Sequence, residues 1–365
     1  MSEAKEKVVI TVGYPISVTD GTTVRARQVM EVLRKRFDVT VLSRSAPGDG
    51  EYAERLRQKG IDVVLRPSRK KLWPIALVRS LPRLRPDLVY CEADIYGFLA
   101  MIPLSRIMGF KAVYEAQALA GMETMQFSKV KGVIYYLMES VVGRSADAVV
   151  ALSLRTKSFF SMVNRRTRFI PVFIDTLVFK PGERRDGGQT KRVGLVGPFD
   201  NLFNAFQLKF LVDNLGRFDP RIAFVLIGEC PAPPSSPRIS LTGFLPSVSE
   251  YASAIRGLDA LLVPVDRATF GPKNKVLEAL ASCVPVFMTE EAAVGLDFAE
   301  SGSNSFVFPK EELVDRMNSL LFDDEAMAKV AAGGRTMVLK WYDRDTCGRE
   351  LIGLIAGMAE LGLSS

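Results

Sequence analysis

Three polar residues around position 275 have the types and the spacing of a phosphate and sugar site. Asn274, Lys275 and Glu278 lie at the start of a segment whose apolar residues recur at helical spacing. Asn274 is a candidate helix N-cap, so Lys273 and Lys275 would stand beside a helix N-terminus. Unpaired backbone N–H groups, the positive end of the helix dipole and ammonium charges together favour a phosphate or diphosphate ligand. Glu278, one turn further on, is placed to accept hydrogen bonds from ribose hydroxyls.

The same pattern has a plainer interpretation. A strand, a loop and a helix with a basic start occur in α/β proteins without a ligand, because a glutamate near a helix start is favourable by itself. The flanking apolar runs Leu261–Val265 and Val284–Met288 indicate buried strands and fit either interpretation.

Composition limits the other kinds of chemistry. The sequence contains no histidine, which excludes Ser-His-Asp triads and histidine-based zinc sites. The four cysteines lie far apart without metal-ligand spacing, so we expect no metal site and a reduced, cytosolic protein. Catalysis would depend on carboxylates, lysine, arginine and backbone dipoles.

The length of 365 residues suits two domains, and 48% hydrophobic with 24% charged residues is typical of a globular protein. Met1–Lys7 is polar and Val8–Val12 has the length of one strand, so we expect no signal peptide. No apolar run reaches the roughly 18 residues of a membrane-spanning helix.

Charge is divided unevenly along the chain. Residues 1–185 carry 31 Lys+Arg and 18 Asp+Glu, a balance of +13, whereas residues 186–365 carry 17 and 23, a balance of −6. The basic half would face an anionic partner or a membrane. The basic segment Arg66–Lys71, followed by Leu72 and Trp73, suits an anionic membrane surface, and equally an exposed loop.

Strands and helices alternate along the chain, which predicts an α/β fold with parallel sheets. The polar segment 183–191, with Gly187-Gly188, reads as a linker, and the strand–helix pattern restarts at Arg192. We therefore expect an N-terminal domain over 1–182, a second domain over 192–340, and a last segment, 341–365, whose helix returns to the first domain.

The segment around position 275, followed by Pro285-Val286, resembles the donor-binding segment of family-4 glycosyltransferases (glycosyltransferase group 1) in its Asn-Lys-x-x-Glu variant. Ala146–Leu152 and Phe169–Pro181 resemble two further segments of that family. The resemblance spans nearly the whole chain and is strongest at 240–297. It implies the GT-B fold, in which two Rossmann-like domains with parallel sheets face a cleft.

The resemblance also implies roles for particular residues. Glu278 would bind the nucleotide ribose, and Lys275 would stabilise the leaving diphosphate. The residues from Gly243 to Leu245 would contact the nucleobase, with simple packing of a strand end as the alternative. The full set of donor-binding candidates is Gly21, Gly197, Gly243, Phe244, Leu245, Arg267, Gly271, Lys273, Asn274 and Glu278.

Gln117 stands where the family has a histidine that faces the cleft and contacts the donor sugar. Glutamine still hydrogen-bonds a hydroxyl but carries no proton at neutral pH. Glu123 is a further candidate for an acceptor contact or a base. Pro198 and Asn204 stand near the usual phosphate-binding arginine and lysine, and Phe270 replaces a sugar-binding glutamate. The resemblance therefore does not identify the donor sugar.

We expect transfer of a hexose-type unit from a nucleotide diphosphate sugar to a lipid-linked or saccharide acceptor, with retained configuration and with neither metal nor cofactor. The expected location is the cytoplasm, with possible contact at the inner membrane face. A nucleotide-sugar epimerase would need acid and base groups, which the missing histidine disfavours. A non-catalytic subunit that binds a nucleotide sugar or a partner glycosyltransferase is the main alternative, favoured by Gln117, Phe270 and Pro198. Nucleic acid is not an expected partner, because the basic residues form no recognisable module.

Overall fold

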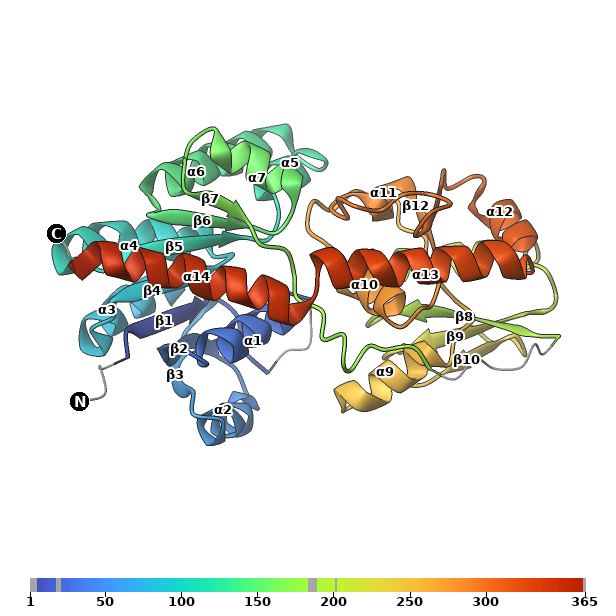
Figure 1. Cartoon of the computed structure of the whole chain (residues 1–365), viewed down its shortest axis with the longest axis horizontal. Coiled ribbons are helices and arrows are strands. Elements are labelled where there is room, and N and C mark those ends of the chain that lie inside the picture. The colour runs from blue at the N-terminus through green and yellow to red at the C-terminus, as the bar shows by residue number, and fades with distance from the viewer. Residues whose placement is uncertain (1–4, 18–20, 183–188, 201, 364–365) are drawn as a thin grey trace. The chain divides into compact units, whose positions relative to one another are not determined.

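The computed structural model describes residues 5–17, 21–182, 189–200 and 202–363 and divides into two compact units. Unit 1 comprises residues 1–173 and 345–365, and unit 2 comprises residues 174–344. Each unit is an α/β domain built on one parallel sheet (Figure 1).

Unit 1 contains a seven-stranded sheet in the order β3-β2-β1-β4-β5-β6-β7, with every pairing parallel. Its central strands are nearly continuous apolar runs, as expected where a sheet is buried on both faces. The strands are β1 (Lys7–Val12), β2 (Asp38–Ser45), β3 (Asp62–Pro67), β4 (Leu88–Glu92), β5 (Lys111–Ala116), β6 (Ala148–Ala151) and β7 (Thr167–Phe169).

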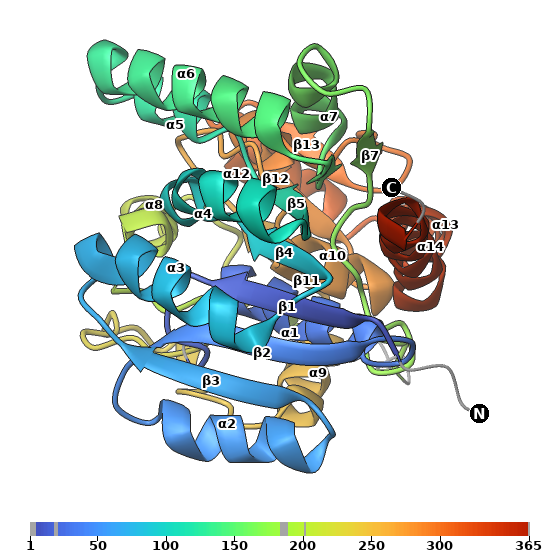
Figure 2. The same ribbon diagram turned by 90° about the vertical axis from the view of Figure 1, so that its left-hand side faces the viewer.

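Helices cover both faces of this sheet: Figure 2 shows α3 and α4 on one side and α14 on the other. Several begin at a residue whose side chain caps the first turn, as Asp94 does by accepting from Gly97 N at 2.9 Å. The helices are α1 (Gly21–Leu33), α2 (Asp49–Gln58), the short 3₁₀ helix η1 (Lys70–Leu72), α3 (Trp73–Leu84), α4 (Ile95–Met108), α5 (Ala120–Met125), α6 (Lys129–Ser145), α7 (Leu154–Ser161) and α14 (Arg344–Leu363).

Unit 2 contains a six-stranded sheet in the order β10-β9-β8-β11-β12-β13, again parallel throughout. This is the strand order of a Rossmann fold, with the order reversing between β8 and β11. The strands are β8 (Lys191–Val196), β9 (Ile222–Ile227), β10 (Ile239–Leu241), β11 (Ala260–Val263), β12 (Val286–Thr289) and β13 (Phe306–Phe308).

The helices of unit 2 pack on this sheet around a core that includes Leu195, Leu226 and Phe287. α9 begins with a capping box between Ser247 and Glu250, which explains why the helix starts at Val248. The helices are α8 (Leu202–Asn214), α9 (Val248–Arg256), α10 (Asn274–Ala281), α11 (Glu290–Ala293), α12 (Leu313–Leu320) and α13 (Asp324–Trp341).

The boundary between the units lies at Phe173, earlier than the expected position 182. Residues 174–182 belong to unit 2 because Ile174 N donates to Tyr342 O at 2.7 Å and Arg344 N donates to Ile174 O at 3.0 Å. Most of the expected linker, residues 183–188, lies outside the described residues, and Lys191 already belongs to β8.

The last helix, α14, belongs to unit 1 from Asp345 onward, although α13 before it belongs to unit 2. Gly348 permits a close approach to α1, since a Cβ there would lie 3.2 Å from a methyl group of Val32. Within the described ranges, none of the helices combines the length and the apolar character needed to span a membrane.

Candidate functional site

The first turn of α10 lies at the carboxyl edge of the sheet of unit 2. The helix begins at Asn274, and its N-cap is Lys273, which is extended and makes no side-chain cap bond. The prediction that Asn274 is the N-cap was therefore wrong by one residue: Asn274 already has helical geometry. The first N–H groups of a helix have no acceptor within it, so this end of α10 still presents backbone donors.

Lys275 joins α10 to the end of β8. Its Nζ donates to the carbonyl oxygen of Val196 at 2.8 Å and to Oδ1 of Asn204 at 3.1 Å. Burial lowers the pKa of Lys275 to about 7, helped by the charge of Lys273 and opposed by that of Glu278. An ammonium with a depressed pKa regains its charge when an anion comes beside it.

The loop after β8 needs a glycine at 197. Gly197 has φ +145°, and a Cβ there would lie 2.3 Å from the amide nitrogen of Asn204. Gly228, after β9, packs so closely that its own Cβ would lie 2.5 Å from the Gly197 carbonyl oxygen. The predicted residues Gly197 and Lys275 thus lie close together, because both contact the side chain of Asn204. This place is the point of the sheet where the strand order reverses.

Glu278 is 9% exposed and accepts a 2.8 Å hydrogen bond from the hydroxyl of Tyr251 on α9. Burial raises its pKa to about 7, and the Tyr251 bond and Lys275 act against this shift. Sequence reasoning missed Tyr251. Its only signal was helical spacing to Ala252 and Ile255, which are buried on the inward face of α9.

The loop before α10 is held by its own contacts. Lys273 Nζ donates to the carbonyl oxygen of Val294 at 2.8 Å, so this predicted donor-binding ammonium is folded back onto the chain. Gly271 packs against Gly295, where a Cβ would lie 2.6 Å from the Gly271 carbonyl oxygen. The Arg267 side chain is 45% exposed and its Nε lies 4.0 Å from Asp266.

The predicted base-contacting residues follow β10 at the same edge of the sheet. Gly243 has φ +71° and forms an antiparallel bridge with Gly228, which holds this turn against the end of β9. Phe244 is 57% exposed and Leu245 is half-buried.

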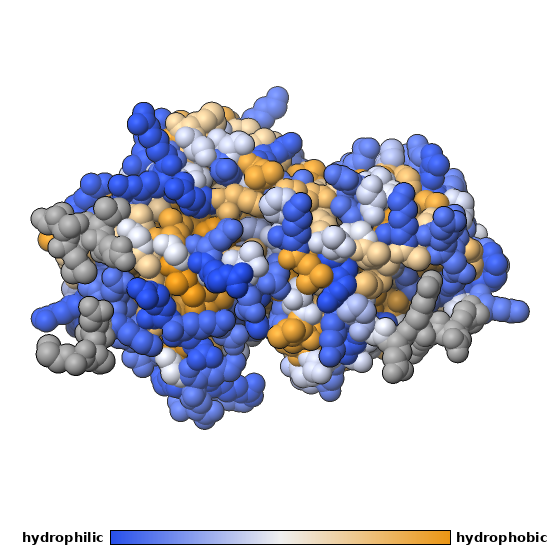
Figure 3. Space-filling view, viewed as in Figure 1, coloured by the Kyte–Doolittle hydropathy of each residue, from blue (hydrophilic) through white to orange (hydrophobic). Residues whose placement is uncertain are grey.

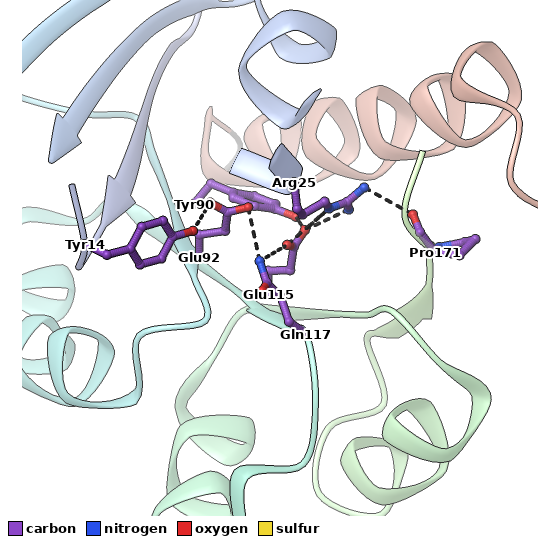
Figure 4. A network of polar contacts seen from close by, with 7 residues as sticks. All are labelled: Tyr14, Arg25, Tyr90, Glu92, Glu115, Gln117 and Pro171. Carbon is purple, nitrogen blue, oxygen red and sulfur yellow. Dashed lines mark hydrogen bonds and ion pairs between the residues drawn. The ribbon is translucent and has the colours of Figure 1, made fainter. Parts of the chain in front are cut away.

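Unit 1 holds a buried charged cluster that the sequence did not predict (Figure 4). Arg25 is 1% exposed and donates to Glu115 from Nε at 3.0 Å and Nη2 at 2.8 Å. Its Nη1 donates to Pro171 O at 3.1 Å, and Tyr90 donates a short hydrogen bond to Glu115. The signal that could have revealed the cluster is a carboxylate inside an apolar strand, VYEA in β5.

A second carboxylate, Glu92, lies beside Glu115 in the register of β4 and β5 and is fully buried. Burial and the charge of Glu115 raise the pKa of Glu92 well above its usual range. Glu92 accepts from the Tyr14 hydroxyl at 3.0 Å, and the Gln117 amide nitrogen lies 3.4 Å from both glutamates (Figure 4). The predicted catalytic residue Gln117 is thus hydrogen-bonded to the two carboxylates Glu92 and Glu115, and Arg25 is the ion-pair partner of Glu115.

The other two predicted residues of unit 1 are Glu123 on α5 and Gly21, which lies one helical turn before Arg25 on α1. Glu123 is half-buried on α5 near Glu139, whose pKa is raised to about 7 chiefly by burial and further by the charge of Glu123. Gly21 is the first residue of α1, and Asp20 before it lies outside the described residues.

Two doubly wound domains, with Gly197, Lys275 and Glu278 at the switch point of the second, define the class of GT-B proteins. Residues 20–171 match the Glycosyl transferase 4-like domain and residues 190–323 match the Glycosyl transferases group 1 domain. The chain therefore belongs to the glycosyltransferases of this family and is an enzyme of the glycosyltransferase type.

Solved structures share the fold over nearly the whole chain. HepE from Anabaena, in complex with UDP-glucose, is 17% identical, with 96% of this chain and 99% of that chain covered and a TM-score of 0.74. Sucrose-phosphate synthase from Thermosynechococcus elongatus is 16% identical, with 99% and 100% covered and a TM-score of 0.79. The lipopolysaccharide outer core galactosyltransferase WaaB, in its apo form, is 14% identical, with 96% and 99% covered and a TM-score of 0.64. No curated protein sequence matches the chain significantly.

Proposed function

We propose that this glycosyltransferase takes its sugar from a nucleotide diphosphate sugar whose diphosphate binds at the first turn of α10. The observation that carries this proposal is the position of Lys275, whose ammonium meets the end of β8 at the switch point of the sheet. Ligands of doubly wound sheets bind at such points, and anions bind at helix N-termini. The UDP-glucose complex of HepE, a protein of the same fold, supports this donor class.

The remaining donor contacts follow from the positions of the side chains. Glu278, oriented by Tyr251, accepts hydrogen bonds from the ribose. The turn from Gly243 to Leu245 receives the base, and the exposed ring of Phe244 offers a stacking surface. Gln117 accepts from a sugar hydroxyl through its amide oxygen, because the amide nitrogen already donates to Glu92 and Glu115.

The proposed reaction retains the configuration at the anomeric carbon. The bond from this carbon to the diphosphate oxygen breaks, the acceptor hydroxyl oxygen bonds to the same carbon, and its proton passes to the departing diphosphate. Lys275 and the backbone N–H groups of α10 stabilise the negative charge that develops on the leaving group. The acceptor class we propose is a lipid-linked or saccharide hydroxyl.

We propose that no metal ion takes part. The sequence has no histidine. Its one Asp-x-Asp triplet, Asp343–Asp345, lies where α13 ends and α14 begins. Asp343 accepts from Thr176 at 2.7 Å, and Asp345 lies 3.7 Å from the ammonium of Lys35.

The test is a panel of nucleotide sugars, each mixed with the purified chain and a membrane lipid extract in the presence of a chelator. Nucleotide diphosphate release and calorimetric binding are measured for the wild type, Lys275→Met and Glu278→Gln. Lys209→Met on α8 is the control, since that side chain is 70% exposed and paired with Asp213. We expect one donor to bind and release its nucleotide, with both properties lost in the two site variants alone. Binding of the donor that is unchanged in Lys275→Met would overturn the proposed site.

A further inference from the structure

Helix α6 of unit 1 exposes a stripe of large apolar side chains. Val130, Val133, Ile134, Leu137 and Val141 are between 48% and 72% exposed. Their spacing places them along one side of the helix, which is about 25 Å long. We call these five residues the α6 stripe. A contiguous exposed apolar surface of this kind marks an interaction site.

The buried side of α6 is mostly small and polar, which is the reverse of the usual pattern: its members are Gly132, Glu139, Ser140, Val142 and Gly143. Gly132 and Gly143 face inward, where a Cβ would lie 2.2 Å from Met125 and 2.6 Å from Val163. Glu139, also buried, accepts from the backbone N–H groups of Ala120 at 2.7 Å and Gly121 at 3.1 Å. Rotation of α6 to bury the stripe would break these contacts, so unit 1 holds the stripe outward.

The surroundings of the stripe extend the apolar area and add positive charge. Figure 2 shows α6 along the outer margin of unit 1, and Figure 3 shows apolar side chains at the surface over α5, α6 and α7. Phe127 and Met162 nearby in the chain are 58% and 73% exposed. Residues 124–174 carry eight Lys+Arg and two Asp+Glu. Of the two acids, Glu139 is buried and Asp147 lies 4.0 Å from Lys111.

We infer that the α6 stripe docks unit 1 onto an anionic lipid bilayer, with the helix in the plane of the interface. An apolar stripe flanked by lysine and arginine is the pattern of helices that lie in the headgroup region. Lys129 and Lys131 flank the stripe at one end of α6 and Arg144 at the other, and all three are exposed. Anionic headgroups attract such residues. A second copy of the chain would instead bring these cations face to face.

The basic segment Arg66–Lys71 was the earlier candidate for membrane contact, and the structure removes Trp73 from it. Trp73 is 2% exposed and donates from its indole nitrogen to Asp94 at 2.7 Å, so its ring is not available to lipid. The inference concerns lipid binding alone and requires neither a donor nor an acceptor. Its success or failure is therefore independent of the sugar transfer proposed above.

The test is co-sedimentation of the full chain with vesicles of phosphatidylcholine alone or with added phosphatidylglycerol. We expect the wild type to bind the anionic vesicles preferentially and Ile134→Ser/Leu137→Ser to lose about tenfold or more in affinity. Lys129→Gln and Lys131→Gln should each cost about fivefold. Val212→Ser on α8, where the side chain is also 48% exposed, and Lys209→Gln are the matched controls and should bind as the wild type does.

The thermal midpoint, measured by circular dichroism, should be unchanged in all variants because the substituted side chains are exposed. Equal vesicle binding by Ile134→Ser/Leu137→Ser and the wild type would overturn the inference, as would wild-type chain that sediments with neither vesicle. Sedimentation velocity separates the rival occupant: self-association that the stripe variant abolishes, without vesicle binding, would make the stripe an interface between copies.

Discussion

The Nζ atom of Lys275 lies 2.8 Å from the carbonyl oxygen of Val196, so the first turn of α10 is attached to the carboxyl end of β8. In this position the lysine donates to two neutral oxygens, the Val196 carbonyl and the Asn204 amide oxygen, and the charge of Glu278 only partly offsets its burial. Burial explains why its pKa falls to about 7. The Lys275 side chain therefore becomes fully charged only when an anion binds beside it.

The first prediction is that a nucleotide diphosphate binds with uptake of a proton. Near pH 8 Lys275 is mostly neutral, because its pKa is about 7, and the diphosphate restores the charge. We expect uptake of about one proton per nucleotide at pH 8, falling as the pH drops below 7. Calorimetry in buffers with different ionisation enthalpies measures this number.

Lys275→Met keeps the apolar stem and removes the titrating group, so the proton uptake should vanish together with about tenfold or more of the affinity. Lys209→Met should change neither. Uptake that persists in Lys275→Met would assign the proton to another group and contradict this account of the site.

Most of the architecture could be predicted from the sequence. Buried parallel strands appear in it as apolar runs, and the loops between them appear as glycine and polar residues. The start of α9 is readable from the sequence, since its capping box, Ser247 followed three residues later by Glu250, is a local signal. The start of α10 was shifted by one residue, because Lys273 rather than Asn274 takes the extended N-cap conformation. Asparagine preference is a tendency, and the loop geometry decides.

The parts of the site that the sequence could not predict depend on contacts between distant residues. Arg25 and Glu115 are 90 positions apart, and only the meeting of α1 and β5 makes the arginine a buried partner instead of a surface charge. Tyr251 and Glu278 meet in the same way, across α9 and α10. The exposure of the apolar side of α6 could not be predicted from the sequence either. A periodic pattern shows that a helix has an apolar and a polar side, but it does not show which side is buried.

The second prediction concerns the dependence of stability on pH through Glu278. Its pKa is about 7 in the folded protein and near 4.5 when exposed, so the folded state holds the proton more tightly. The resulting stability is fully present below about pH 4.5 and is lost as the pH rises to about 7. Glu278→Gln lacks this loss and should exceed the wild type at pH 7.5 by on the order of 2 kcal/mol.

Urea unfolding between pH 4.5 and 8 measures the difference between the two proteins. Glu311→Gln, an exposed glutamate before α12, is the control and should follow the wild type. A difference between Glu278→Gln and the wild type that stays constant over this range would show that folding does not raise the pKa of Glu278.

The third prediction uses two glycines of unit 2. Gly197→Ala forces a Cβ into a φ of +145° and to within 2.3 Å of the Asn204 side chain, which is a partner of Lys275. We expect a loss of about 1–3 kcal/mol in unfolding free energy, and weaker nucleotide binding because the Lys275 partner moves. Gly216→Ala is the matched control, since a Cβ at Gly216 has open space. Nucleotide affinity that is equal in the two variants would separate the Gly197 loop from the site.

The fourth prediction separates the two buried glutamates of unit 1. Burial and the neighbouring charge of Glu115 raise the pKa of Glu92 well above its usual range, so the folded protein favours the protonated form, which a glutamine resembles. Glu115 is the counter-charge of Arg25, and Glu115→Gln leaves that guanidinium buried without an ion pair. We expect Glu115→Gln to cost about 3–5 kcal/mol of unfolding free energy, whereas Glu92→Gln should cost less than about 1 kcal/mol.

Urea unfolding of both variants at pH 7 gives the comparison, and Arg25→Met should reproduce the larger loss. The double variant Arg25→Met/Glu115→Gln should recover part of it, because both partners of the buried pair are then neutral and their losses do not add. Similar losses in Glu92→Gln and Glu115→Gln would instead mean that the two carboxylates share the arginine equally. In that case Gln117, whose amide nitrogen lies 3.4 Å from both, would be oriented by two equivalent carboxylates.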